Sequence, residues 1–418
     1  MEIKRDIYLQ RLIDREWNGM VKVVTGIRRC GKSYLLFKLF KNHLLNSGVD
    51  ESHIIEMPLD IPVFIKYLSA EPLYNHIYGL IRNRDERYYV LLDEIQLADN
   101  FESVLNGLLR MENVDVYVTG SNSKLLSRDV ITEFRGRADE IHLRPLSFSE
   151  FYSVFDGTVS QAWKEYMTYG GLPEIVNKKD GEQKSDYLTF IMETVYLRDI
   201  KERHNIRAPA VMDNLVDVLS SNIGCLSNPR KMKDTLIANG NKTADESTIS
   251  DYISYLEDAY LFEESERYDL KKKLYLKHAV KYYSVDPGLR NARLNFRQTE
   301  FTHIMENVIF NELRSRGFRV DVGVIDVSER ASDGKIMKKR LEIDFVANKG
   351  DKRYYIQSAY GMDSDEKKKS EIRPFMKTDD FFKKIVVTGY DSSVCRDDKG
   401  ILYIGVMDFL LDQNSLDL

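Results

Sequence analysis

The stretch Gly26-Ile27-Arg28-Arg29-Cys30-Gly31-Lys32-Ser33 fits the pattern G-x-x-x-x-G-K-[ST]. A β-branched run at residues 20–25 precedes it, and the apolar run after it predicts a helix from about Lys32. This strand, loop and helix context is what a phosphate-binding loop requires. The glycines let backbone N–H groups surround phosphate oxygens, and a helix N-terminus adds the positive end of its dipole. The eight residues therefore predict a binding site for a nucleoside triphosphate.

Two further positions supply the chemistry that hydrolysis requires. Lys32 is expected to reach the β- and γ-phosphates, and the Ser33 hydroxyl to ligate Mg²⁺. The apolar run at residues 87–92 predicts a second strand, which ends in the adjacent carboxylates Asp93 and Glu94. We expect Asp93 to hold Mg²⁺ and Glu94 to orient the attacking water or accept its proton. The alternative is an exposed acidic pair that closes a strand.

Polar and basic residues follow a third predicted strand at residues 114–119. Asn122 is the candidate for contacting the attacking water or the γ-phosphate, with Ser121 as the second choice, although the same residues also suit a plain turn. Arg135 and Arg137 are expected near the same edge of the sheet, where one of them would act as an arginine finger. The alternative is that they are ordinary surface arginines.

The composition bounds the class of protein. The chain has 418 residues, enough for two or three domains, with 43% hydrophobic and 30% charged residues as in ordinary globular proteins. A net charge of -5 argues against a globally basic nucleic-acid-binding protein. The three cysteines form no C-x-x-C pair, and no apolar run is long enough to span a membrane. We therefore expect a cytoplasmic protein without a zinc cage.

Several motifs together resemble one family. They are Val24-Thr25-Gly26-Ile27-Arg28-Arg29-Cys30-Gly31-Lys32-Ser33, Leu92-Asp93-Glu94-Ile95-Gln96, Thr119-Gly120-Ser121-Asn122, Phe134-Arg135-Gly136-Arg137, Leu143-Arg144-Pro145-Leu146-Ser147-Phe148 and Tyr169-Gly170-Gly171-Leu172-Pro173. In combination they resemble the AAA-type prokaryotic P-loop ATPases that carry a C-terminal domain of unknown function, over almost the whole chain to about Tyr360. The resemblance implies an α/β fold with ATP and Mg²⁺ as ligands. It implies a parallel-sheet P-loop ATPase domain (1–148), a helical lid (149–208), a winged-helix-like domain (209–290) and a nuclease-like C-terminal α/β domain (291–418).

The middle of the chain leaves its role open. Gly170 and Gly171 suit either a hinge of the lid or an ordinary turn between helices. The predicted helix at residues 247–258 carries Ile249, Ile253 and Leu256 on one face, and a hairpin with lysines 271–273 at its turn follows. The opposite helix face carries two carboxylates and no Arg or Lys, which favours a structural or protein-docking role over DNA contact.

The C-terminal part resembles PD-(D/E)XK nucleases. Carried over by position, the helical acid of that metal site falls on Glu306, the strand acid on Asp344 and the third ligand on Gln357. The lysine that assists catalysis in such sites falls on Ala359. We therefore expect a retained fold without cleavage activity.

These features predict an ATP-hydrolysing molecular switch or remodelling ATPase. The alternatives are an ATP-dependent DNA-acting enzyme and a nucleotide-binding interaction module with little turnover. The sequence names neither the protein partner nor the oligomeric state, which depends on whether an arginine finger acts in cis or in trans.

Overall fold

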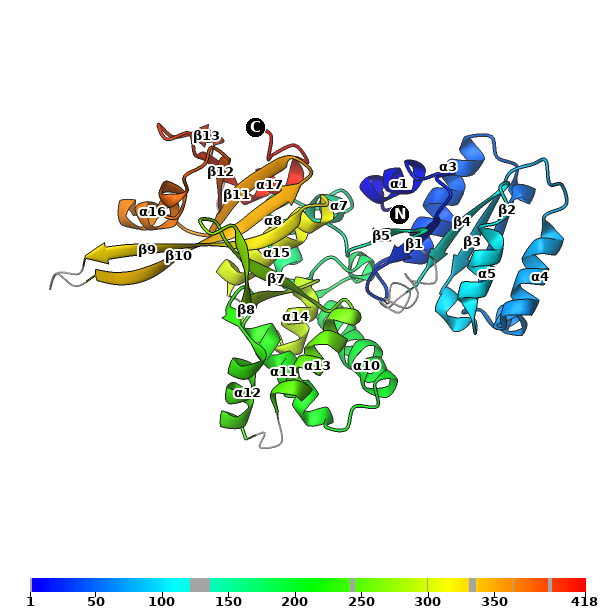
Figure 1. Ribbon diagram of the computed structural model, residues 1–418, viewed down its shortest axis with the longest axis horizontal. Coiled ribbons are helices and arrows are strands. Elements are labelled where there is room, and N and C mark those ends of the chain that lie inside the picture. Colours follow the sequence, from blue (N-terminus) through cyan, green and yellow to red (C-terminus); the bar gives the residue numbers. More distant parts are fainter. Residues whose placement is uncertain are drawn as a thin grey trace. The chain divides into compact units, whose positions relative to one another are not determined.

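The chain forms two compact units, residues 1–145 with 258–260 and residues 146–257 with 261–418. The computed structural model in Figure 1 describes residues 2–120, 136–240, 245–298, 300–330, 336–362, 364–389 and 393–418. The first unit ends close to the expected boundary at residue 148. The expected boundaries at residues 208 and 290 both fall inside the second unit.

A parallel five-stranded sheet forms the centre of the first unit. Its strands are β1 (Val21–Thr25), β2 (Ile54–Pro58), β3 (Tyr88–Asp93), β4 (Val114–Thr119) and β5 (Ala138–His142), in the order β2-β3-β4-β1-β5. All four neighbouring pairs are parallel. Strands covered on both faces are typically continuous apolar runs, as β3 is up to Asp93, whereas β1 and β4 each carry one charged residue. The predicted α/β class with a parallel sheet is confirmed.

Helices precede the first strand and follow several of the others. They are α1 (Asp6–Ile13), α2 (Lys32–Tyr34), the π-helical segment Leu35–Phe40, α3 (Lys41–Asn46), α4 (Ala70–Leu80) and α5 (Phe101–Leu108), with short 3₁₀ turns at Glu51–His53, Pro62–Tyr67 and Ile95–Leu97. Side chains of α4 and α5 pack with Val23, Val90 and Val116 in one core on one face of the sheet. The helix after the phosphate loop begins at Lys32, as predicted.

Helices dominate the first half of the second unit. They are α7 (Phe148–Tyr152), α8 (Val159–Tyr169), the 3₁₀ turn Pro173–Asn177, α9 (Gly181–Phe190), the π-helical segment Ile191–Leu197, α10 (Arg198–Arg203), α11 (Pro209–Ser221), α12 (Pro229–Ala238), α13 (Glu246–Asp258) and α14 (Pro287–Arg293). In α13, Ile249, Ile253 and Leu256 are buried, as the spacing predicted. The Gly170–Gly171 turn packs against Asp286, whose carboxylate accepts a hydrogen bond from the Gly171 N–H at 2.7 Å.

The second sheet extends across the expected boundary at 290. Its strands are β6 (Leu226–Ser227), β7 (Phe262–Asp269), β8 (Leu274–Ser284), β9 (Arg319–Arg330), β10 (Ile336–Lys349), β11 (Lys352–Ala359), β12 (Lys383–Thr388), β13 (Cys395–Arg396) and β14 (Leu402–Gly405), in the order β13-β14-β12-β11-β10-β9-β7-β8-β6. Its helices are α15 (Phe301–Ser315), α16 (Asp365–Ile372) and α17 (Val406–Leu411), with a 3₁₀ turn at Phe375–Lys377. The expected hairpin is β7–β8, and β7 pairs in parallel with β9. This pairing joins the hairpin to the C-terminal strands.

Within the described ranges, no helix is both long enough and apolar enough to cross a membrane.

Candidate nucleotide-binding site

The phosphate-binding loop connects β1 to α2 in a conformation that requires glycine. Gly26 has a φ of 139° and Gly31 a φ of 98°, while Arg29 between them also has a positive φ of 66°. A Cβ added to Gly26 would lie 2.1 Å from the backbone oxygen of Leu143. No side chain fits at that distance, so the first glycine is required by the close approach of the residue that follows β5.

The other loop residues divide between the interior and the surface. Ile27 and Cys30 are buried, Arg28 is half-buried and Arg29 is exposed. The guanidinium of Arg5 donates a hydrogen bond to the Cys30 carbonyl oxygen at 3.1 Å, which ties the N-terminal segment to the loop. Burial raises the pKa of the Cys30 thiol. Cys30 therefore supports the loop as a small buried side chain, and the arginines are the loop side chains that extend outward.

The Lys32 side chain turns back over the loop. Its ammonium donates hydrogen bonds to the backbone oxygens of Gly26, at 3.0 Å, and Ile27, at 3.2 Å, and the residue is 5% exposed. Both acceptors are neutral. The positive charge is therefore held at the loop by carbonyl oxygens, in the position from which an ammonium can bind phosphate oxygens.

Ser33 and Asp93 come together at the carboxyl end of the sheet. Asp93 is the last residue of β3 and is 3% exposed. Burial raises its pKa, while hydrogen bonds from the Ser33 and Thr119 hydroxyl groups lower it. A serine hydroxyl beside a carboxylate is a set of oxygen donors that Mg²⁺ accepts. The two residues fit the expected metal site.

Thr119 links the two acidic residues and was not identified from the sequence. Its hydroxyl donates a hydrogen bond to the Asp93 carboxylate. The same hydroxyl accepts a hydrogen bond from the Glu94 backbone N–H at 3.0 Å. Glu94 is half-buried, has a φ of 50° and accepts a hydrogen bond from the Gln96 amide. The available signal was a polar residue at the last position of β4, the strand that lies next to β3.

The prediction that Arg137 lies at the nucleotide-binding edge of the sheet is wrong. Its backbone oxygen accepts a hydrogen bond from the Val21 N–H at 2.9 Å, at the start of β1. The phosphate loop leaves the other end of β1, five residues along, which is about 16 Å at the rise of a strand. The exposed Arg137 therefore lies at the amino edge of its own sheet. Ser121, Asn122 and Arg135 lie outside the described residues.

The residues expected from the nuclease resemblance lie close together in the second unit. Glu306 in α15, Asp344 in β10 and Gln357 in β11 are each less than a tenth exposed. The Asp344 N–H donates to the Gln357 side-chain oxygen at 3.4 Å. Ala359 is buried as expected for an apolar side chain, and the ammonium comes from another strand, at Lys281 of β8.

Lys281 lies at the centre of this cluster. Its Nζ is 2.9 Å from Glu306, 2.7 Å from Glu342 and 3.4 Å from Asp344. Burial acts to lower the pKa of Lys281, but the surrounding Glu306, Tyr283, Asp344 and Glu342 raise it well above its ordinary value. Across the described residues, no group of three or more His, Cys, Asp and Glu side chains is arranged to hold a metal ion. The signal in the sequence that could have indicated this cluster was Lys281, a charged residue within the apolar run at residues 279–283.

Both parts of the chain are similar to known protein families. Residues 18–152 match the family model of an AAA domain, and residues 160–300 match a domain of unknown function, DUF8612. An uncharacterized protein of Haemophilus influenzae is 33% identical over 414 residues, which is 98% of each chain. An uncharacterized protein of Methanocaldococcus jannaschii is 28% identical, covering 90% of this chain and 81% of its own.

Among solved structures, a Walker-type ATPase of Pyrococcus abyssi matches 70% of this chain and 96% of its own, with 16% identity and a TM-score of 0.49. The family is established by the sequence matches, above all by the relative from Haemophilus influenzae that aligns from end to end. With its phosphate loop, its parallel sheet and its matched AAA domain, this chain belongs to the AAA-type P-loop ATPases that carry a domain of unknown function.

Proposed function

We propose that this protein binds ATP with Mg²⁺, hydrolyses it to ADP and phosphate, and uses the cycle as a molecular switch or to remodel a partner. The observation that carries the proposal is the set of contacts at the carboxyl edge of the first sheet. Asp93 accepts hydrogen bonds from Ser33 and Thr119, and Thr119 also binds the backbone of Glu94. The loop that carries Lys32 leaves the same edge.

Each residue has a distinct role in this proposal. Lys32 binds the β- and γ-phosphates, and Ser33 and Asp93 hold Mg²⁺, which neutralises charge on the phosphate oxygens when it is bound. Glu94 orients the attacking water and accepts its proton. Its left-handed backbone and its hydrogen bond to Thr119 set the direction of its side chain. Asn122 senses the γ-phosphate.

The test is steady-state hydrolysis of Mg-ATP by the wild type and by Glu94→Gln, each with and without duplex DNA. We expect turnover in the wild type and at least a 100-fold loss in the variant, the lower end of what general base catalysis contributes. Binding of ATP to the variant should be retained. Glu71→Gln is the matched control, because Glu71 is an exposed glutamate in the first turn of α4. Tight binding without turnover in the wild type would favour the interaction module instead.

A DNA-acting enzyme is the second candidate, and Lys281 is the observation that favours it. The lysine supplies the ammonium that the position of Ala359 lacks, beside Glu306 and Asp344. Against this candidate, the same ammonium already compensates the carboxylates that would have to hold a metal. Nicking of supercoiled plasmid in Mg²⁺, lost in Asp344→Asn, would support the enzyme. Absence of nicking in the wild type would leave the cluster a structural role.

We also propose a cytoplasmic location and a protein partner. The free thiols of Cys30, Cys225 and Cys395 support a reducing compartment. A finger role for Arg135 or Arg137 in trans would require an oligomer that forms with ATP. Light scattering with and without ATP, on the wild type and on each arginine changed to alanine, tests that requirement.

A further inference from the structure

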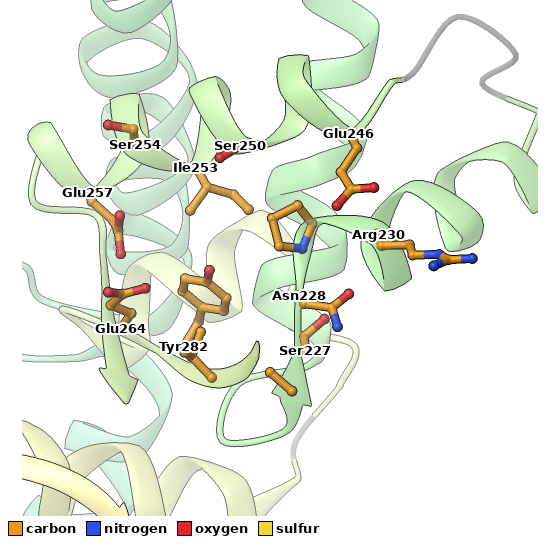
Figure 2. Close-up of a pocket in the computed structure, with 13 residues that line it drawn as sticks. Ser227, Asn228, Arg230, Glu246, Ser250, Ile253, Ser254, Glu257, Glu264 and Tyr282 are labelled. Atoms are coloured by element: carbon orange, nitrogen blue, oxygen red, sulfur yellow. The ribbon is translucent and has the colours of Figure 1, made fainter. Parts of the chain in front are cut away.

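A polar cavity lies within the second unit, between α13, the β6–α12 turn and the β7–β8 hairpin (Figure 2). Its volume is about 550 Å³, within the range of small-molecule sites. Its lining residues are Ser227, Asn228, Pro229, Arg230, Glu246, Ser250, Ile253, Ser254, Glu257, Glu264, Ala279, Val280 and Tyr282. None of them belongs to the nucleotide site.

The pleat of β8 separates this cavity from the Lys281 cluster. Successive side chains of a strand point to opposite faces of the sheet, so the neighbours Lys281 and Tyr282 point to opposite sides. Lys281 contacts Glu306, whereas Tyr282 lines the cavity. Glu264 lies directly opposite Tyr282 in the antiparallel β7–β8 pair, so both side chains stand on the cavity side. The cavity therefore belongs to a different face from the carboxylate cluster.

Tyr282 places a hydroxyl group in this cavity. The residue is 5% exposed, and its hydroxyl makes no hydrogen bond to any residue that the structure describes. Burial raises the pKa of the phenol, and the charges of Glu257 and Glu264 raise it further. The hydroxyl thus stays protonated beside two carboxylates. The phenol lines the cavity, so its hydroxyl group is available to bind a ligand there.

The charge of the lining decides the class of ligand. Among the described lining residues there are three carboxylates, Glu246, Glu257 and Glu264, and one cation, Arg230, so the formal charge of this lining is negative. In Figure 2, Glu257 and Glu264 lie close together on the same side of Tyr282, and Glu246 and Arg230 lie on the opposite side of the cavity. An anion would be repelled here. A cation would be attracted, and Tyr282 would accept a hydrogen bond from its N–H group.

The remaining walls suit an aliphatic chain. Pro229, Ile253, Ala279 and Val280 contribute apolar surface between the polar ends of the cavity. We propose that this cavity binds an organic cation, an ammonium or guanidinium group carried on a short aliphatic chain. The source is either a free diamine or a basic side chain of a partner protein, and the chemistry of recognition is the same for both.

The experiment is titration calorimetry on the full chain without nucleotide, so its result does not depend on the ATPase proposal. The probes are 1,5-diaminopentane, its neutral isostere 1,5-pentanediol, and a short lysine-containing peptide with blocked ends. We expect saturable binding of at least one cation and none of the diol. Binding of the diamine alone assigns the site to a free amine, and binding of the peptide alone assigns it to a partner.

Two variants and a control make the result specific. Glu264→Gln should weaken the cation about tenfold, the loss expected for one hydrogen bond to a charged group. Tyr282→Phe removes only the hydroxyl and should weaken binding about fivefold. Asp251→Asn makes the same charge change as the first variant at an exposed residue of α13 outside the cavity, and should bind as the wild type does.

Three outcomes would overturn the proposal. They are equal heats for the diamine and the diol, no saturation with either cation, and equal loss of affinity in Glu264→Gln and Asp251→Asn. Because Glu264 is exposed, its variant should fold. The test therefore holds even if Tyr282→Phe is destabilised.

Discussion

Replacing Thr119 by valine should impair both hydrolysis and stability, although Thr119 touches neither phosphate nor water in the proposed mechanism. The side chain is fully buried, at 0% exposed. Its hydroxyl donates to Asp93 and accepts from the Glu94 N–H. Valine has nearly the same shape, so the change opens no cavity and removes only these two hydrogen bonds.

The magnitude follows from those two bonds. Loss of a hydrogen bond to a charged group costs about 1.5 to 3 kcal/mol, and a buried N–H without a partner costs about 1 to 3 kcal/mol. We therefore expect the free energy of unfolding of this unit to fall by about 3 kcal/mol. The left-handed backbone of Glu94, with a φ of 50°, also loses its restraint. If half of that energy is felt in the transition state, kcat falls by about tenfold.

Urea unfolding and steady-state hydrolysis of Mg-ATP measure the two effects on the same preparations. Thr119→Ser is the control, since serine keeps the hydroxyl and loses only a methyl group. It should retain most of the activity of the wild type. Valine and serine variants with equal activity, or a valine variant with unchanged kcat and stability, would refute the link between Thr119 and the acidic residues.

Three other changes have expected outcomes. Gly26→Ala would place a Cβ 2.1 Å from the Leu143 backbone oxygen, and titration with a fluorescent ATP analogue should show affinity reduced more than tenfold. Asp115→Ala leaves the fully buried Lys22 ammonium without its carboxylate; urea unfolding should show a loss of about 3 to 5 kcal/mol, and a loss below 1 kcal/mol would contradict a buried ion pair. Burial raises the pKa of Asp286 from 3.8 to about 6. The folded state therefore holds this proton more tightly, and its stabilising contribution, present below about pH 4, is lost as the pH rises through 6. The expected loss is about 3 kcal/mol, measured as the difference in pH dependence between the wild type and Asp286→Asn.

The sequence alone determined the phosphate loop and the order of elements around it. Gly26 and Gly31 mark positive φ angles, and the apolar runs before Gly26 and Asp93 predict buried strands. These requirements are local, because backbone conformation and strand burial depend on residues adjacent in the chain. The proximity of Ser33 and Asp93 could also be predicted, since parallel strands bring their carboxyl ends to one edge.

Contacts between distant segments were decided only by the tertiary structure. Thr119 reaches Asp93 because β4 lies beside β3 in the sheet. Lys281 joins Glu306 and Asp344 because β7 pairs with β9, across the expected boundary at residue 290. Strand order and register depend on packing across the whole chain, and a shift of one residue would turn Lys281 toward the opposite face of the sheet. For that reason most residues of the nucleotide site could be predicted from the sequence. The position of Lys281 in the carboxylate cluster, and the cavity on the other face of β8, could be identified only from the folded structure.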